Sequence, residues 1–376
     1  LLGLTIAAPL AAGPIGTVGN EFAGALPDGY AVLDIRDEDT CVDGALPNAR
    51  CLPAAQLLYG AQGEPINFHA LRWALGTLGL TGAIHGNEVT PSVGTIRRVL
   101  ELLDPEELSG TVMAVPIANP LGVGQLSRET PGDGQNVNAV FFEPDQTKYT
   151  QPVKTVSEQI ADALAAGVLA HLDFQIDFHS GGDNHSVHMI EFTQDPVSKG
   201  MARAFNMPIL LFDEWRPGQM WRESERLGAK VIVAECGGGG ALYNEWVERS
   251  AQGTLNVMRY LDMLPGEIAP PPTQYVVRGD SGHEHNANIL KPKEGGLIVP
   301  DEAITPQVVF DGQPVSGIPV LGELLNMYDL TVRQRFEAPF QRTLLIAAVV
   351  GPAWSYPGTY AYILFDADGP DVEILD

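Results

Sequence analysis

Residues 78–88 read LGLTGAIHGNE, and residues 91–100 continue the chain as PSVGTIRRVL. The first stretch is small and apolar up to its histidine, which is typical of a strand buried on both faces. The second has apolar residues at helical spacing, with Thr90 expected at the N-cap and a proline at the first helical position. The turn between them therefore carries His85 and Glu88 at the carboxyl end of a strand, where open α/β sheets place their ligands.

This turn offers an imidazole and a carboxylate three residues apart, and Gly86 keeps the bend between them open. Zinc accepts both donor types, and a catalytic zinc site has three protein ligands and one open position for water. Two ligands do not make a site, because an ordinary N-capping turn that contains a histidine has the same sequence. A metal site therefore requires a third ligand and a charged residue that acts on the water.

Composition limits the classes of partner. The chain has 376 residues, of which 45% are hydrophobic, enough for one large core and a smaller domain. Acidic residues outnumber basic ones by 47 to 22, giving a formal net charge of −25. We expect no nucleic-acid partner, because phosphate binding requires clustered Lys and Arg and the sequence has no such cluster. An acidic surface suits solubility at high salt and can attract cationic substrates.

The cysteines and the N-terminal region carry few signals. The three cysteines include no CxxC pair, which excludes a thiolate zinc knuckle. Cys41 and Cys51 could form a disulfide that closes a short loop, or both could be reduced thiols. Residues 1–20 are uncharged but lack a basic n-region, so we expect an ordered segment, followed by a loop-rich extension to about residue 75. No stretch is long and apolar enough to span a membrane, and the cytoplasm is the default compartment.

Beyond the first turn, strands and helices alternate, which predicts a mostly parallel mixed sheet covered by helices on both faces. We expect strands at 111–117, 174–178, 186–192, 208–212 and 230–234, and helices at 153–170, 195–205, 219–227 and 243–264. The long polar connection at 121–151 is typical of a functional loop.

A proline-rich linker at 265–273 separates two predicted domains. The catalytic domain would cover residues 1–265, including the N-terminal extension. Residues 274–376 would form a small all-β domain, because their short Val-, Ile- and Tyr-rich segments are punctuated by Gly and Pro. Helical periodicity there is limited to residues 320–327.

Two more strands deliver charged residues to the same sheet edge. His179 follows the strand at 174–178 and is the candidate third ligand, while Asp177 is either the carboxylate that orients its imidazole or a simple hydrogen-bond acceptor. Glu235 follows the strand at 230–234 and precedes four glycines, which allow close approach of substrate or backbone.

Other histidines fit less well as ligands. His185 and His188 lie on an alternating strand, which favours a place in a pocket wall or on the surface. His283-Glu284-His285 fits an exposed hairpin better than a second metal site.

The order of these motifs resembles the succinylglutamate desuccinylase and aspartoacylase family, relatives of zinc carboxypeptidases that remove acyl groups from amino acids. The resemblance extends from about residue 75 to the end of the chain. It is carried by GAIHGNE (82–88), NP (119–120), Arg128, DGQNVN (133–138), DFHS (177–180) and AE (234–235).

This resemblance implies a zinc carboxypeptidase-like α/β fold, a second β-domain and an enzyme that hydrolyses a small amide, often as a homo-oligomer. One Zn²⁺ per chain would be held by His85, Glu88 and His179, with a water in the fourth position. Glu235 would be the general base and Arg128 the oxyanion donor. Asn136 and Asn138 would join Arg128 in binding substrate. Alternatively, Glu235 is structural and Arg128 only anchors its loop.

One position departs from the family pattern. The family has an arginine that grips a substrate carboxylate where this chain has Ala139. Three explanations are consistent with this departure. The substrate lacks that carboxylate, or neutral donors such as Asn138 bind it. Alternatively, another arginine takes over the role, namely Arg216, Arg222 or Arg226. We therefore expect an amide hydrolase of this family's type with unusual specificity.

Two rival functions remain at this stage. A carboxypeptidase-like metallopeptidase is disfavoured, because a peptide's terminal carboxylate would have lost its arginine clamp. A non-catalytic binding protein on the same fold is disfavoured by the retention of ligands, base and oxyanion donor.

Overall fold

The computed structural model describes residues 76–141, 154–212, 218–238, 241–268, 273–278 and 289–375, and three short strands, β1 (Thr5–Ala7), β2 (Val32–Asp34) and β3 (Ala49–Cys51). Apart from these strands, the predictions for residues 1–75 lie outside the described residues. The same holds for the pairing of Cys41 with Cys51 and for the His283-Glu284-His285 motif.

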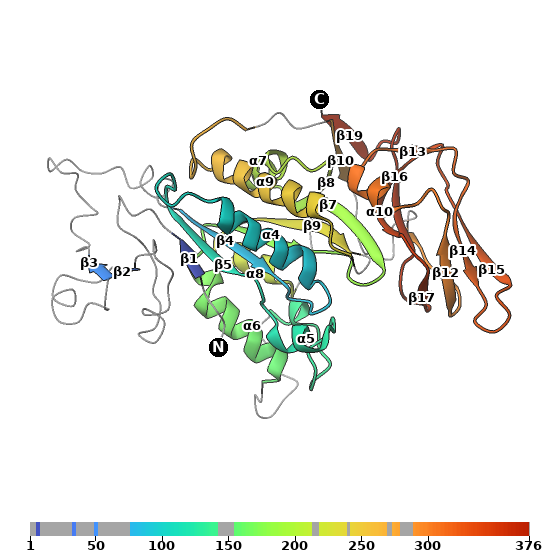
Figure 1. Ribbon diagram of the computed structural model, residues 1–376, viewed down its shortest axis with the longest axis horizontal. Coiled ribbons are helices and arrows are strands. Elements are labelled where there is room, and N and C mark those ends of the chain that lie inside the picture. Colours follow the sequence, from blue (N-terminus) through green and yellow to red (C-terminus); the bar gives the residue numbers. More distant parts are fainter. Residues whose placement is uncertain are drawn as a thin grey trace.

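A large mixed sheet organises the chain (Figure 1). Its centre is parallel, in the order β5 (Thr111–Val115), β4 (Thr77–Gly82), β6 (Phe174–His179) and β9 (Lys230–Gly238). Next to β9 lies the antiparallel β7 (His185–Phe192), and β8 (Ile209–Phe212) runs parallel to β7. Every residue of β6 is buried, as expected for a strand covered on both faces.

Helices cover both faces of this sheet (Figure 1). One face packs against α4 (Val89–Leu102), α7 (Pro196–Ala204) and α9 (Asn244–Tyr260), whose apolar residues share a core with β4 and β6. The other face packs against α6 (Val156–Gly167) and α8 (Met220–Arg226), which share a second core with β5 and β9. The predicted α/β architecture is confirmed, and each of these helices lies where its apolar periodicity placed it.

The predicted start of the first helix was wrong. Helix α4 begins at Val89, so Thr90 lies inside the helix and Glu88 occupies the N-cap position. The turn closes early, because the Glu88 N–H already donates to the His85 carbonyl at 3.1 Å. The connection at 121–151 includes a short helix, α5 (Pro120–Gln125), which Asn119 caps by accepting from the Gly122 N–H.

Strands from beyond residue 273 also join the large sheet. In that part of the chain β10 (Gln274–Arg278) pairs with β8, and β16 (Arg342–Val349) pairs with β7. Further strands continue this edge, namely β18 (Tyr362–Asp366), β11 (Ile289–Leu290), β13 (Val315–Ser316) and β19 (Val372–Leu375). The domain boundary at 265–274 stays a prediction, because residues on both sides of it share one sheet.

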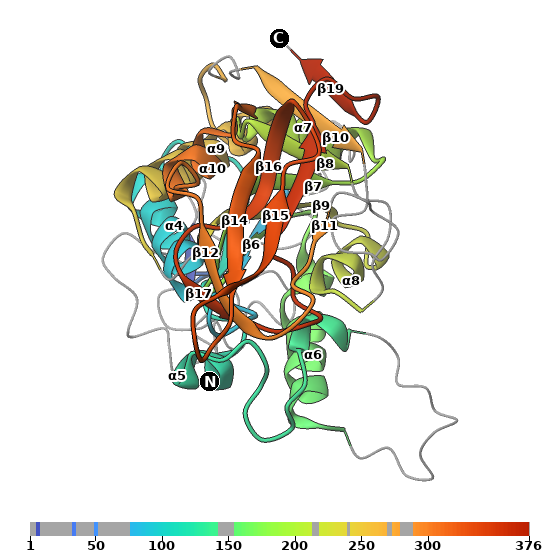
Figure 2. The ribbon, with the colours of Figure 1, turned by 90° about the vertical axis from the view of Figure 1, so that its right-hand side faces the viewer.

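A separate antiparallel sheet lies beside these strands (Figure 2). Its order is β15 (Val332–Glu337), β14 (Val320–Leu325), β12 (Gly296–Pro300) and β17 (Ala353–Ser355). The helical expectation for residues 320–327 was wrong, because β14 is paired on both sides and this pairing outweighs local periodicity. A helix lies instead at α10 (Pro306–Asp311), which Thr305 caps. Each helix in the described ranges is too short or too polar to traverse a lipid bilayer.

Candidate metal centre and substrate cavity

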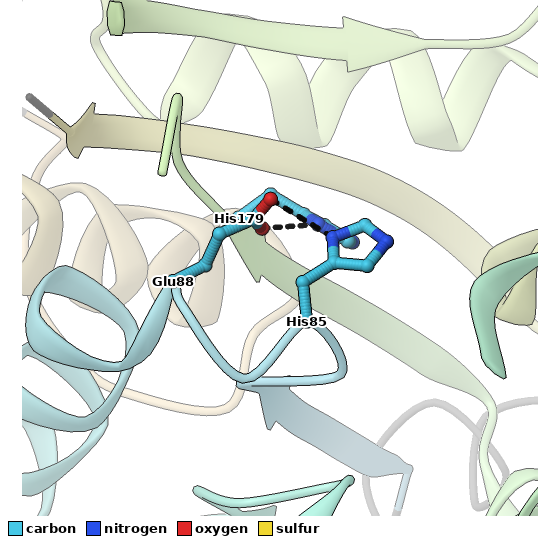
Figure 3. Close-up of side chains that lie close together, drawn as sticks. All are labelled: His85, Glu88 and His179. Atoms are coloured by element: carbon cyan, nitrogen blue, oxygen red, sulfur yellow. Dashed lines mark hydrogen bonds and ion pairs between the residues drawn. The ribbon is translucent and has the colours of Figure 1, made fainter. Parts of the chain in front are cut away.

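Three candidate ligands meet at the carboxyl edge of the sheet (Figure 3). His85 and Glu88 lie on the turn after β4, and His179 ends the neighbouring parallel strand β6. Because parallel strands end at the same edge, the two segments converge. One ligand atom from each side chain lies within 4.8 Å of the other two, and all three residues are at most 4% exposed.

Both imidazoles present their Nδ1 atoms to the Glu88 carboxylate. His85 Nδ1 lies 2.9 Å from Glu88 Oε1, and His179 Nδ1 lies 3.0 Å from Glu88 Oε2. The opposite ring nitrogens face oxygen acceptors: His85 Nε2 is 3.1 Å from Asn136 Oδ1, and His179 Nε2 is 3.1 Å from Asp177 Oδ2. These acceptors favour the tautomer with hydrogen on Nε2, which leaves the Nδ1 lone pairs pointing at the centre.

This donor set fits zinc. Two imidazole nitrogens and one carboxylate oxygen are the ligands of a common catalytic zinc site, with a fourth position open. The buried Nδ1 of His85 has no hydrogen bond of good geometry within the described chain, which is the state expected of an atom reserved for a cation. The residues present therefore fit the metal that the sequence predicted.

The charges in the cluster are strongly coupled. Burial alone would raise the pKa of Glu88, but its interactions with His85 and His179 outweigh burial and hold that pKa well below its ordinary value. Burial opposes charge on His179, yet Asp177 and Glu88 raise the pKa of that imidazole well above its usual range. Burial lowers the pKa of His85, although Glu88 opposes the change. Glu88 is thus held ionised, and its charge favours positive charge on the groups next to it.

The predicted contact between Asp177 and His179 is confirmed. A further buried pair of hydrogen bonds holds the carboxylate: Thr81 Oγ1 donates to Asp177 Oδ1 at 2.8 Å, and Gln175 Nε2 donates to Thr81 Oγ1 at 2.9 Å. The orientation of the His179 imidazole is therefore fixed by neighbouring residues on β4 and β6.

Gly86 joins the ligand turn to the loop that carries Arg128. The Gly86 N–H donates to the Ser127 carbonyl at 2.9 Å, and a Cβ at Gly86 would lie 2.0 Å from the carbonyl carbon of Gly122. Only a glycine allows two backbone segments to approach this closely. The turn and the loop are therefore positioned together.

Arg128 reaches the ligand cluster, as its place in the sequence motif suggested. Its Nη1 donates to Glu88 Oε1 at 2.7 Å, and its side chain is 47% exposed at the cavity. Its assignment as oxyanion donor stays a prediction. Asn136 accepts from His85 and from the Asn138 N–H, and Asn138 Oδ1 accepts from the Met220 N–H at 2.8 Å. Their assignment to substrate binding also stays a prediction.

Glu235 lies directly beside the metal cluster. It lies within β9 (Lys230–Gly238), in register with His179 on β6, so the prediction that the strand ends before Glu235 was wrong. Its Oε2 is buried without a hydrogen-bond partner in the described part of the chain, and burial raises its pKa to about 8. The predicted use of the glycines is confirmed for backbone approach: Gly238 has φ +126°, and a Cβ there would lie 2.1 Å from the His185 carbonyl oxygen.

A cavity of about 250 Å³ opens over these groups. It contains all the predicted site residues, namely His85, Glu88, Arg128, Asn136, Asn138, His179 and Glu235. The sequence motifs did not indicate the remaining wall, which consists of Ser180, Val187, Met189, Glu191, Gln219, Trp221, Val233, Ala347, Tyr360 and Ile363. The alternation of β7 was a usable signal, because every second residue of a strand beside the site faces the cavity. The residues of β16 and β18 gave no signal, because their pairing is non-local.

The less favoured histidines lie outside the ligand cluster, as predicted. His185 Nε2 bonds to the Tyr360 carbonyl oxygen at 2.7 Å. His188 is 1% exposed on the opposite face of β7, with its ring 4.8 Å from the Trp246 ring, so its predicted place in a pocket wall or on the surface was wrong.

The arginines considered as substitutes for the missing clamp are not cavity residues where the structure describes them. Arg222 contacts Glu225 and Arg226 contacts Glu223, whereas Arg216 lies outside the described residues.

Comparisons with known proteins identify the family of the chain. A model of the succinylglutamate desuccinylase/aspartoacylase catalytic domain matches residues 74–261, half of the 376-residue chain. An N-α-acetyl-L-2,4-diaminobutyric acid deacetylase from Halomonas elongata is 28% identical over 204 residues, covering 51% of this chain and 56% of the relative. The chain thus spans little more than half the length of that curated relative.

Solved structures share the fold over a longer range. A succinylglutamate desuccinylase/aspartoacylase from Rhodobacter sphaeroides superimposes with a TM-score of 0.62 at 21% identity, covering 78% of this chain and 86% of that one. An ectoine utilization protein from Ruegeria pomeroyi, in a product-bound structure, gives 0.63 at 23% identity, covering 77% and 85%. Because the catalytic-domain match includes every proposed metal ligand as well as Glu235, the chain belongs to the succinylglutamate desuccinylase/aspartoacylase family.

Proposed function

We propose that this chain is a zinc-dependent amidohydrolase that removes the acyl group from an N-acyl amino acid or a related small amide. The observation that carries the proposal is the buried cluster of His85, Glu88 and His179 in one cavity with Glu235, whose Oε2 has no hydrogen-bond partner among the described residues. Family membership supports it, and the Halomonas relative is named as a deacetylase of an N-acetylated amino acid.

His85, Glu88 and His179 would hold one zinc ion. When bound, zinc supplies Lewis-acid chemistry, polarising the carbonyl and making a water acidic enough to attack at neutral pH. Asn136 and Asp177 would keep both imidazoles in the ligating tautomer through the hydrogen bonds at their Nε2 atoms.

Glu235 would move the proton. Its Oε2 would accept a proton from the attacking water and then deliver it to the leaving nitrogen, a task that needs a carboxylate within hydrogen-bond reach. Its register with His179 supports this role, because it places the carboxylate beside the metal ligands.

Arg128 and Asn138 would contact the substrate. The guanidinium of Arg128 would stabilise the negative oxygen of the tetrahedral intermediate, where losing one donor typically costs about 10²–10³-fold in rate. Asn138 Oδ1 is engaged by the Met220 N–H, so its Nδ2 is the atom that would donate to a substrate.

The size of the cavity favours a small substrate. About 250 Å³ lies below the volume of roughly 300–1,000 Å³ typical of sites for drug-sized ligands. This favours a small N-acyl amino acid over the peptide that a carboxypeptidase-like enzyme would bind.

The test is acetate release by zinc-loaded protein from N-acetyl amino acids, with Nα-acetyl-L-2,4-diaminobutyric acid included. We expect Glu235→Gln to bind zinc but lose about 10²–10⁴-fold in kcat, and His85→Ala to lose zinc. Glu302→Gln, which makes the same change at an exposed position, is the control. Bound zinc without turnover of any amide would favour a binding protein, and release of C-terminal residues from peptides would favour a peptidase.

A further inference from the structure

Two side-chain amides of the cavity wall each keep an NH₂ group that has no hydrogen bond within the described part of the chain. Gln219 and Asn138 both line the cavity. Gln219 Oε1 accepts from the Trp221 indole N–H at 2.7 Å, and Asn138 Oδ1 accepts from the Met220 N–H at 2.8 Å. An indole N–H and a backbone N–H can only donate, so these contacts fix which way each amide is turned. Gln219 Nε2 and Asn138 Nδ2 are therefore the atoms left to donate to a ligand.

Gln219 is held close to the position at which the family has its arginine. Gly218, with φ +89°, packs against this position, and a Cβ there would lie 2.6 Å from the Ala139 carbonyl oxygen. The Phe141 N–H also donates to the Gly218 carbonyl at 3.1 Å. Only a glycine combines this φ with so close an approach. The segment that begins α8 therefore packs on the segment that carries Asn138 and Ala139, and brings Gln219 into the cavity wall beside them.

The side chain of Gln219 has no role in the helix that it precedes. Gln219 is the N-cap residue of α8, yet its side chain accepts no hydrogen bond from the first turn. Helices are capped mainly by the shorter side chains of Ser, Thr, Asp and Asn. The amide is held instead by Trp221, whose side chain is buried. A polar group fixed in this way at the wall of a cavity is typical of a residue that orients a ligand.

A substrate carboxylate would find few cations in this cavity. Arg128 is the sole Lys or Arg among the described residues that line it, and Arg128 already donates to Glu88 at 2.7 Å. A carboxylate can also be bound by neutral N–H donors, and hydrogen bonds to an ionised acceptor are stronger than those between neutral groups. The amides of Gln219 and Asn138 supply one donor for each carboxylate oxygen.

We propose that Gln219 is a substrate-binding residue whose Nε2, together with Asn138 Nδ2, binds the carboxylate of the N-acyl amino acid in place of the family's arginine. This rests on the proposed deacylase function and specifies how that site recognises its substrate. A carboxamide at the same position offers one acceptor oxygen, and its NH₂ group would face a second donor. The pair of amides therefore selects a carboxylate over a carboxamide without a positive charge.

The experiment measures binding to zinc-loaded Glu235→Gln protein by titration calorimetry, so that turnover does not consume the probes. The probes are Nα-acetyl-L-2,4-diaminobutyric acid and its α-carboxamide, which differ only at the proposed contact. We expect the acid to bind about 10- to 100-fold more tightly, the usual range for a hydrogen bond to a charged group. Adding Gln219→Glu should reverse this preference, because the variant keeps an oxygen for Trp221 but replaces the donor by a negative oxygen. Gln252→Glu, the same change at an exposed position of α9, should preserve the preference.

Equal binding of the two probes before Gln219 is changed would overturn the proposal, as would binding of neither. A Gln219→Glu variant that keeps the preference would also overturn it. Gln219→Met, which has similar length but no donor, guards against a variant that fails to fold and should weaken binding of the acid about 10- to 100-fold without reversing the preference. Arg216→Gln should leave the preference intact, and its loss there would assign the carboxylate to Arg216 instead.

Acetate release by the zinc-loaded wild-type protein tests the deacylase function separately. Release without a preference for the acid would refute only the role of Gln219. A preference for the acid without any release would refute only the deacylase function.

Discussion

Replacing His188 tests whether the sheet buries a neutral imidazole behind the catalytic face. His188 is 1% exposed, and its ring contacts the rings of Trp246 and Phe310. Burial, assisted by the charge of Arg249, lowers the pKa of His188 to about 3. Arg249 also stacks on Phe310 at 3.6 Å, so a second positive charge in this cluster is doubly unfavourable.

The magnitude follows from linkage. The unfolded chain binds a proton at His188 below about pH 6.5, whereas the folded chain does not until about pH 3, so acid favours unfolding in this interval. Each pH unit below 6.5 contributes about 1.4 kcal/mol. Between about pH 7.5 and pH 5, His188 should therefore remove about 2 kcal/mol from the free energy of unfolding.

The assay is urea unfolding of wild type and His188→Leu across this pH range, with a chelator present throughout. His85, His179 and His185 titrate in both proteins, so their contributions cancel in the difference. The wild type should lose about 2 kcal/mol more than the variant. His171→Leu, at an exposed position, should leave the wild-type pH dependence unchanged. Parallel curves for wild type and His188→Leu would refute the reasoning.

Three further outcomes concern the metal site and are expected together. Gly86→Ala should lower zinc affinity and activity by at least about 10-fold, because the added methyl group would lie about 2 Å from the Gly122 backbone. Equilibrium dialysis against zinc measures the affinity, and acetate release measures the activity. Asp177→Asn should weaken zinc binding by about 10- to 100-fold while the far-UV spectrum stays unchanged, since the hydrogen bond at His179 Nε2 loses its charged acceptor. Removing zinc should lower the free energy of unfolding by about 4 kcal/mol compared with the protein in zinc at about 1,000 times its Kd. Thermal unfolding with and without a chelator would detect this change. Coincident unfolding curves would contradict metal binding.

The candidate ligands were predictable from sequence because they lie at the ends of strands. A small apolar run followed by His85, and a second followed by His179, predict convergence, since parallel strands deliver their carboxyl ends to one edge. Glu235 departs from this rule, because β9 continues through Gly238 by pairing with β7 and Glu235 lies within the strand. The start of α4 was not predictable to the residue, because the His85–Glu88 hydrogen bond closes the turn before Thr90.

The rest of the cavity depends on pairings between distant parts of the chain. Tyr360 and Ile363 reach the site because β16 pairs with β7 and β18 pairs with β16. No local pattern specifies which strands are neighbours, so these residues could not be placed from the sequence. The strand at 320–325 was misjudged for the same reason, since its conformation is set by partners on both sides.

The position of the proposed proton-transfer group, Glu235, depends on the register of β9. Ile232 and Ala234 face the core under α4 and α9, whereas Val233 and Glu235 face the cavity. A slip of one residue would turn Glu235 into the apolar core and Cys236 toward the cavity, removing the carboxylate from the reaction centre. That slip would also bury a carboxyl among apolar residues, at a cost of several kcal/mol. The burial of β9 on both faces therefore holds Glu235 beside His179.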